Sequence, residues 1–133
     1  MHSFEITGID HVVVRVADAA RALAFYRDVL GLTVEREQPE LGLIQLRAGR
    51  SLIDLVPGEP ADTTRPRAPN IDHFALEVRP FDEAYLRGHL QAMRVPIVES
   101  GLRYGAGGEG PSLYVLDPDG NKVELKAAMR ADR

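Results

Sequence analysis

Hydrophobic and polar residues alternate along two short runs, 112–116 and 122–126, on either side of a polar segment. In that segment Pro118 sets φ to about −65° and Gly120 adopts a positive φ without steric cost, which is typical of a tight turn. The pattern predicts a β-hairpin with Glu124 in the middle of its second strand. A buried, unpaired carboxylate would be costly, so we expect Glu124 to lie in water, to pair with a cation or to bind a metal ion.

The same periodicities predict a helix and four strands in the first half of the chain. Apolar residues take every second position from 12 to 16, which predicts a strand with His11 and Arg15 on its polar side. Asp18 is a suitable N-cap for a helix whose apolar residues recur at helical spacing, and Gly31 is placed to end it. Alternation then predicts three further strands, in residues 32–35, 41–47 and 51–56.

After a segment rich in proline and charge, the pattern begins again. The triplet Ile-Asp-His that ends at His11 returns with His73 as its last residue, directly before a predicted strand at 74–78. The elements that follow are a helix (82–93), a strand (95–99), a glycine-rich loop (101–110) and the hairpin. Residues 52–55 then correspond to residues 122–125, which sets Asp54 on Glu124. Each half is therefore β-α-β-β-β, and the predicted fold class is α+β.

Neither half is large enough to bury its sheet alone, so we expect a single domain. Its predicted parts are a first module (about 8–56), a linker (57–70), a second module (about 71–126) and a C-terminal tail (127–133). The polar faces of the two sheets carry His11, Arg15, Asp54, His73, Glu77, Ser112, Tyr114 and Glu124. If the sheets curl around a common axis, equivalent positions converge. Two imidazoles and one or two carboxylates then suit a divalent transition metal with open coordination positions.

Composition narrows the function classes. The net charge of −4 argues against nucleic acid as the main partner, because binding phosphates needs a clustered basic surface. No apolar run approaches the length that spans a membrane, and no signal segment precedes the first strand. Cysteine is absent, which excludes disulfides, a thiol nucleophile and a zinc knuckle. We therefore expect a cytoplasmic protein that acts on a small molecule.

Four segments in order, IDHVVVRV, FYRDVLGL, IDHFALEV and SLYVLDPDGNKVEL, resemble the vicinal oxygen chelate superfamily. This superfamily includes glyoxalases, extradiol dioxygenases, fosfomycin-resistance proteins and bleomycin-binding proteins. The resemblance implies paired modules that form an open curled barrel around a metal ion, commonly in a homodimer. It places the metal on His11, His73 and Glu124, with Asp54 as either a fourth ligand or a base that lies beside the ligands without binding the metal. Nickel, zinc, manganese and iron all suit these ligands.

The resemblance favours a glyoxalase-like lyase or isomerase, in which the metal stabilises an enediolate or alkoxide. Extradiol dioxygenases carry an acid–base histidine where this chain has residues 105–107, which contain none. Fosfomycin thiol transferases, a second alternative, share Ser112 and Tyr114 but have threonine at the place of Val13. A non-catalytic, bleomycin-type binding protein is a third, although such relatives lack the ligand histidines.

These analogies assign further roles to individual residues. The candidate catalytic residues are Glu124, Asp54 and Tyr114. The candidate substrate-binding residues are Arg15, Val13, Arg103, Tyr104, Ser112 and Tyr114. The glycine-rich loop at 101–110 is expected to be a mobile lid that turns Arg103 or Tyr104 toward the metal.

Overall fold

The structure is a computed structural model that describes residues 7–58 and 72–129. The chain forms two compact units, residues 1–60 and 61–133, and each is described here by itself. Most of the predicted linker and the end of the predicted tail, residues 130–133, lie outside the described residues. In the described part of the chain, no helix has the length and apolar character needed to cross a membrane.

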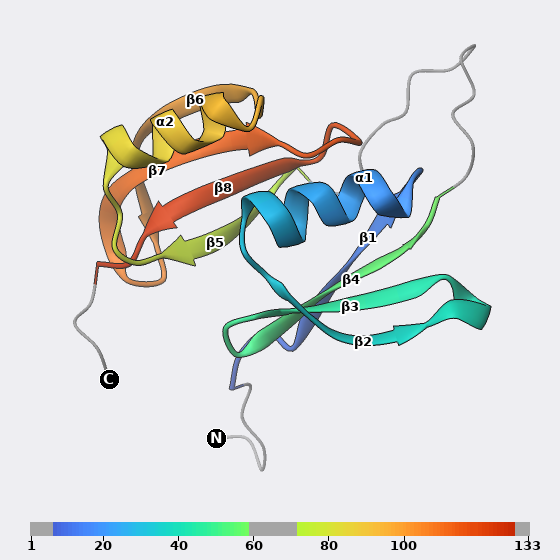
Figure 1. The fold of residues 1–133 in the computed structure, drawn as a ribbon. Helices are drawn as coiled ribbons and strands as arrows, with labels where there is room; N and C mark the ends of the chain where they lie inside the picture. The colour runs from blue at the N-terminus through green and yellow to red at the C-terminus, as the bar shows by residue number, and fades with distance from the viewer. Residues whose placement is uncertain (1–6, 59–71, 130–133) are drawn as a thin grey trace, which may run out of the picture. The chain divides into compact units, whose positions relative to one another are not determined.

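The first unit contains one four-stranded mixed sheet (Figure 1). Its elements are β1 (His11–Val16), α1 (Ala19–Leu23), the π-helical η1 (Ala24–Val29), β2 (Thr33–Gln38), the 3-10 turn η2 (Pro39–Leu41), β3 (Leu43–Ala48) and β4 (Ser51–Pro57). The strand order is β1-β4-β3-β2, with β1 parallel to β4 and the other neighbours antiparallel.

The second unit repeats this topology. Its elements are β5 (Phe74–Val78), α2 (Glu83–Ala92), β6 (Ile97–Gly105), β7 (Gly108–Leu116) and β8 (Lys122–Ala127). The order β5-β8-β7-β6, with β5 parallel to β8, matches the first sheet strand for strand. Helix α2 lies against one face of this sheet (Figure 1). The predicted α+β fold of two β-α-β-β-β modules is confirmed.

Both helices begin directly after an aspartate N-cap, Asp18 as predicted and Asp82, which the prediction had counted as the start of its helix. The Asp18 carboxylate accepts a hydrogen bond from the Arg21 amide at 3.0 Å, and Asp82 accepts one from the Tyr85 amide at 3.1 Å. The first helix differs from the prediction beyond α1, because it continues as a π-helical turn. Two consecutive aromatic residues, Phe25 and Tyr26, lie in this turn, and both are buried.

The predicted loop at 101–110 is wrong in its secondary structure. Strand β6 continues to Gly105 and β7 begins at Gly108, so these residues form the tip of a paired hairpin. Gly105 and Gly110 have no side chains to cover one face of the hairpin, and the side chain of Lys126 lies over this face. A Cβ atom at Gly105 would come within 3.1 Å of Lys126 Cε, and Lys126 Nζ donates to the Gly108 carbonyl at 3.1 Å. The glycines therefore make room for Lys126, and whether the hairpin tip moves as a lid stays a prediction.

The hairpin of β7 and β8 is confirmed, and Asp117 organises its turn. The Asp117 carboxylate accepts hydrogen bonds from the amides of Asp119 and Asn121, at 2.9 and 2.7 Å. Its second oxygen accepts one from Asn121 Nδ2 at 2.8 Å. Gly120 has a φ of 81°, the left-handed conformation expected of it.

Candidate metal and substrate site

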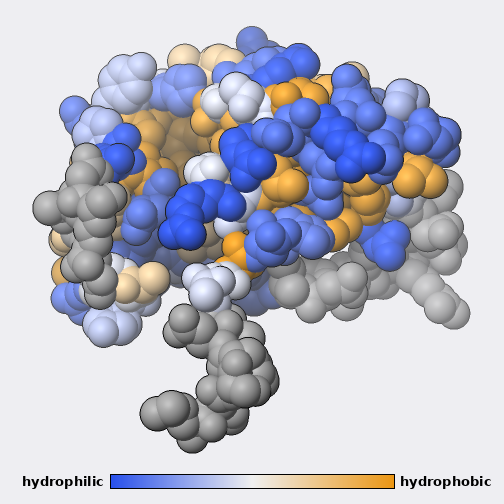
Figure 2. All heavy atoms as spheres, turned by 90° about the horizontal axis from the view of Figure 1, so that it is seen from below, coloured by the Kyte–Doolittle hydropathy of each residue, from blue (hydrophilic) through white to orange (hydrophobic). Residues whose placement is uncertain are grey.

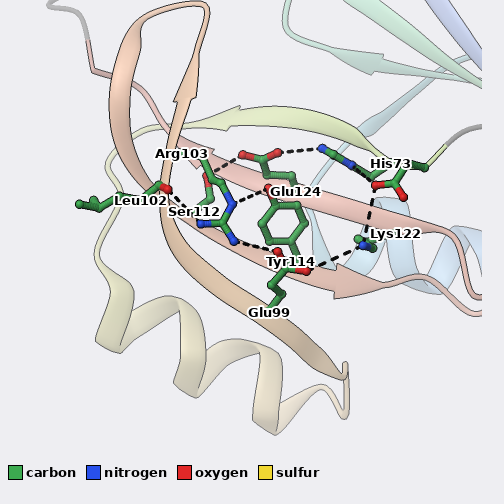
Figure 3. Close-up of polar contacts among 9 residues, drawn as sticks. His73, Glu99, Leu102, Arg103, Ser112, Tyr114, Lys122 and Glu124 are labelled. Carbon is green, nitrogen blue, oxygen red and sulfur yellow. Dashed lines mark hydrogen bonds and ion pairs between the residues drawn. The ribbon is translucent and has the colours of Figure 1, made fainter.

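Two predicted metal ligands meet in the second unit. The parallel pairing of β5 with β8 sets Ala75 opposite Glu124, and His73 lies two residues before Ala75 on the same side. His73 Nε2 is 3.0 Å from Glu124 Oε1 (Figure 3). The sheet register therefore brings together an imidazole and a carboxylate from residues that are 51 positions apart.

Glu124 is buried, with 6% of the residue exposed, so it does not lie in water. The Ser112 hydroxyl donates to Glu124 Oε2 at 2.7 Å. Burial acts to raise the pKa of Glu124, but hydrogen bonds from Ser112 and Tyr114 and the proximity of His73 outweigh it and lower that pKa. The carboxylate is thus ionised at neutral pH, with one oxygen held by Ser112 and the other directed at His73.

A second carboxylate contacts the other nitrogen of each predicted ligand histidine. Asp72 Oδ2 lies 2.7 Å from His73 Nδ1, and Asp10 Oδ2 lies 2.8 Å from His11 Nδ1. The hydrogen bond with His73 lowers the pKa of Asp72, and Lys122 adds to this. A carboxylate at Nδ1 accepts the hydrogen bond of that nitrogen and leaves Nε2 for the second contact, which in a metal-bound histidine is the ion and in His73 of this structure is Glu124.

Tyr114 forms the wall of the site beside His73. The two rings meet edge to face, with centroids 5.3 Å apart. Arg103 Nε donates to the Tyr114 hydroxyl at 3.2 Å, and Lys122 Nζ lies 5.7 Å from the centre of its ring. Burial, together with the Glu124 carboxylate, raises the pKa of Tyr114, so its hydroxyl keeps its proton. The neighbouring Glu99 accepts a hydrogen bond from Arg103 Nη2 at 2.7 Å.

The first unit places its candidates at equivalent positions. Asp54 lies opposite Val13, and Val13 is two residues after His11. In the same way, Glu124 lies opposite Ala75, which is two residues after His73. Asp54 is buried, and Gln45 Nε2 donates to its Oδ1 at 3.2 Å. The hydrogen bond with Asp10 raises the pKa of His11, and Asp54 makes a smaller contribution in the same direction.

The remaining candidates are distributed as follows. Val13 and Arg15 are exposed on β1, on the same side as His11. Tyr104 is 85% exposed and, by alternation along β6, lies on the face opposite to Arg103. No group of three His, Cys, Asp or Glu side chains at metal-binding spacing occurs among residues 7–58 and 72–129. The described donors are the contacting pair His73 and Glu124 in the second unit and, at the equivalent positions of the first, His11 and Asp54, and the full ligand set stays a prediction.

The sequence analysis overlooked several residues that contact the candidates: Asp10, Gln45, Asp72, Glu99 and Lys122. Asp10 and Asp72 had a visible signal, because an aspartate precedes the histidine in both copies of the repeat. Gln45 and Lys122 had none, because their partners lie on neighbouring strands, and Glu99 contacts Arg103 from four residues away on the same strand.

Comparison with known proteins identifies the family. The model of the Glyoxalase/Bleomycin resistance protein/Dioxygenase superfamily matches residues 8–125. The chain belongs to this superfamily. The predicted resemblance is therefore confirmed, since vicinal oxygen chelate is another name for the same group of proteins.

Individual superfamily members are similar over nearly the whole chain. The virulence protein STM3117 of Salmonella typhimurium is 34% identical over 126 residues, which cover 90% of this chain and 83% of that protein. Its crystal structure matches with a TM-score of 0.74, covering 93% of this chain and 98% of that one. Glutathione transferase FosA of Serratia marcescens is 28% identical, covering 96% of this chain and 86% of FosA. Lactoylglutathione lyase of Agrobacterium tumefaciens has the same fold, with a TM-score of 0.64 and 24% identity, covering 93% of this chain and 96% of that one.

Members of the superfamily typically use divalent metal ions. The donors of this chain fit such an ion, because imidazole and carboxylate are ligands that zinc, nickel, manganese and iron accept. A buried, ionised carboxylate that faces an imidazole nitrogen is also an arrangement that a bound cation would stabilise.

Because Asp72 orients His73, we expect Asp72→Ala to weaken divalent metal binding by roughly 10–100-fold, the usual effect of losing a partner of a ligating histidine. Competition titration of the metal-free protein with a chelating dye measures the affinity. ¹⁵N NMR of the histidine rings before metal is added should show His73 shifting toward the tautomer with the proton on Nε2. Glu83→Gln, in an exposed ion pair on α2, is the control. If the metal affinity and the His73 tautomer are both unchanged, the contact between Asp72 and His73 is only a surface ion pair.

Proposed function

We propose that this protein is a metal-dependent enzyme that acts on a small substrate with vicinal oxygens, as a glyoxalase-like lyase or isomerase. The observation that supports it most is the buried Glu124 carboxylate, 3.0 Å from His73 and kept ionised by its hydrogen-bond donors. If the contact between His73 and Glu124 were only a structural ion pair, there would be no reason for the other copy of the repeat to carry a histidine and a carboxylate at the same positions. Asp54 occupies the matching position beside His11 in the first unit.

The proposed ligands are His11, His73 and Glu124, with Asp54 as either a fourth ligand or a base that lies beside the ligands without binding the metal. The metal ion, when bound, would supply Lewis acidity to the substrate oxygens. Ser112 fixes the orientation of the Glu124 carboxylate through its hydroxyl.

Two further side chains are suited to contact substrate. Tyr114 keeps its proton and can donate a hydrogen bond to a substrate oxygen beside His73. Arg103 touches the Tyr114 hydroxyl and can bind a negatively charged group of the substrate.

Thiol transfer is the second candidate function. Similarity to glutathione transferase FosA extends over 96% of the chain, and Ser112 and Tyr114 lie together beside Glu124. In this alternative the same site would activate an electrophilic substrate toward the sulfur of glutathione. Both candidates therefore use a metal ion and a small oxygen-rich molecule and differ in the bond that is formed.

A substrate panel distinguishes the candidates. Metal-free protein, purified without a nickel column, is loaded separately with nickel, zinc, manganese or iron(II). Each form is then given the hemithioacetal of glutathione and methylglyoxal, fosfomycin with glutathione, or catechol. We expect turnover of the hemithioacetal that is lost in a folded Glu124→Gln variant. A thioether product from fosfomycin would establish the second candidate, and a yellow ring-opened product from catechol would establish ring cleavage. Ligand binding without turnover in any metal form would indicate a sequestering protein and overturn the proposal.

Asp54 is expected to be the weakest member of the ligand set, since its side chain is shorter than that of Glu124 and is held by Gln45. Asp54→Asn should therefore lower activity more than it lowers metal affinity, whereas Glu124→Gln should lower both. Metal affinity and kcat/KM are measured on the same preparations. If Asp54→Asn empties the site as completely as Glu124→Gln does, Asp54 is a full ligand.

The predicted cytoplasmic location and homodimer remain proposals. Gel filtration with light scattering tests the second of them.

A further inference from the structure

Strand β6 is an exposed sheet edge with an unusual distribution of side chains. It pairs with β7 and lies at the end of the strand order β5-β8-β7-β6. Val98, Leu102 and Tyr104 are 48%, 65% and 85% exposed. They account for three of the ten large apolar residues that are exposed in the described chain. Hydrophobic side chains also reach the surface in places among hydrophilic ones on the face drawn in Figure 2. A long edge with apolar side chains is a ready template for pairing with another strand.

The sequence of β6 is complementary to itself in the antiparallel direction. A two-fold axis at Gly101, perpendicular to the sheet, sets each residue opposite the one equally distant from the axis. Within the regular part of the strand, the resulting pairs are Gly101 with Gly101, Ser100 with Leu102, and Glu99 with Arg103. The opposite charges of Glu99 and Arg103 thus face one another twice across the axis, and such cross-strand pairs stabilise a sheet.

Other registers lose this match. An axis at Ser100 sets Glu99 opposite Gly101, and an axis at Leu102 sets Glu99 opposite Gly105. Strand pairing with β7 is regular from Glu99 onward, so the segment from Glu99 to Arg103 lies in the regular part of β6, whereas Val98 lies at the irregularity between Ile97 and Glu99.

Strand β2, which takes the equivalent edge position in the first sheet, lacks this property. An axis at its central charge, Arg36, would set Glu35 opposite Glu37. Like charges directly opposite each other destabilise a strand pair. The self-complementary edge is therefore a feature of β6 and does not follow from the repeat.

We propose that β6 pairs antiparallel with β6 of a second copy of this chain, about a two-fold axis at Gly101. Each Glu99 then faces Arg103 of the partner copy, which replaces the contact of 2.7 Å within one chain. The two four-stranded sheets become one continuous eight-stranded sheet. A single strand pair is small beside the roughly 1,200–2,000 Å² of a standard interface, so the dimer should depend on concentration.

Charge reversal tests the register. Glu99→Arg and Arg103→Glu each set like charges opposite one another at both contacts across the axis, and each should weaken the dimer at least tenfold in sedimentation velocity. An equimolar mixture of the two variants restores opposite charges across the axis, so dimers should reappear as heterodimers. The contact within each chain stays broken in the mixture, so this rescue reports only the contact between chains. Glu83→Arg and Arg87→Glu reverse an exposed ion pair of 2.8 Å on α2 and should leave dimerisation unchanged.

A disulfide provides an independent readout, because the chain has no cysteine of its own. Ser100 and Leu102 would lie opposite one another, at the Cα separation of about 4.5–5.5 Å found across antiparallel pairs, which a disulfide can span. Under mild oxidation, a mixture of Ser100→Cys and Leu102→Cys proteins should cross-link faster than either protein alone. A protein that stays monomeric at all concentrations would overturn the proposal. So would a dimer that is insensitive to both reversals, or single variants that cross-link as fast as their mixture.

Discussion

Replacing His73 with alanine is expected to remove the divalent metal ion from the protein, whereas His89→Ala is expected to leave metal content unchanged. His73 directs Nε2 at the buried Glu124 carboxylate, and Asp72 holds its other nitrogen. Without the imidazole, the remaining donors would have to hold the ion with an incomplete ligand set. The loss of affinity should exceed the roughly 10–100-fold effect of removing a mere partner of a ligand.

Metal content is measured by mass spectrometry of protein dialysed against each ion, and affinity by competition with a chelating dye. His89 is the matched control, because it lies on α2, where it stacks on Tyr85. Glu124→Gln should behave like His73→Ala if both residues are ligands. Metal content that is unchanged in both variants would place the ion elsewhere or show that the protein binds none.

The second large effect is expected at the turn between β7 and β8, in Asp117→Ala. This buried carboxylate accepts two hydrogen bonds from backbone amides and one from Asn121 Nδ2. Removing it would leave three donors without this acceptor. At roughly 1 kcal/mol or somewhat more for each hydrogen bond, the free energy of unfolding should fall by about 2–4 kcal/mol.

Urea unfolding followed by circular dichroism measures this change. Asp117→Asn keeps one carbonyl oxygen for the two backbone amides and should lose less stability than Asp117→Ala. Asp28→Ala, at an exposed carboxylate paired with Arg27, is the control, and we expect a change within about 0.5 kcal/mol there. A similarly small effect of Asp117→Ala would mean that the turn forms without the carboxylate.

Local features of the fold could be predicted because neighbouring residues specify them. Alternation located the strands, and Asp18, placed before a helical pattern, proved to be its N-cap. The repeated triplet ending in His11 and His73 revealed two modules, and the register of each parallel strand pair confirms the match of Asp54 with Glu124. Periodicity also placed Ser112, Tyr114 and Glu124 on one face of the hairpin.

Where the prediction failed, the deciding contacts come from residues distant in the chain. Glycines at 101–110 indicate a loop when read alone, because glycine favours neither strand nor helix. In the fold these residues pair as the ends of β6 and β7, and Gly105 and Gly110 leave room for the side chain of Lys126 on β8. The first helix also continues after α1 as a π-helical turn, which the helical spacing of its apolar residues did not predict.

In the candidate site, too, some features follow from the local sequence and others depend on residues that are distant in the chain. The sequence alone determined the repeat, the strand faces and the identity of His73 and Glu124 as candidate ligands, since these follow from periods of two and from a motif that occurs twice. Only the tertiary structure decided that Glu124 is buried rather than solvated, that Ser112 holds one of its oxygens, and that Asp72 holds His73. Burial and hydrogen-bond partners depend on which strands become neighbours, and no local pattern of side chains carries that information.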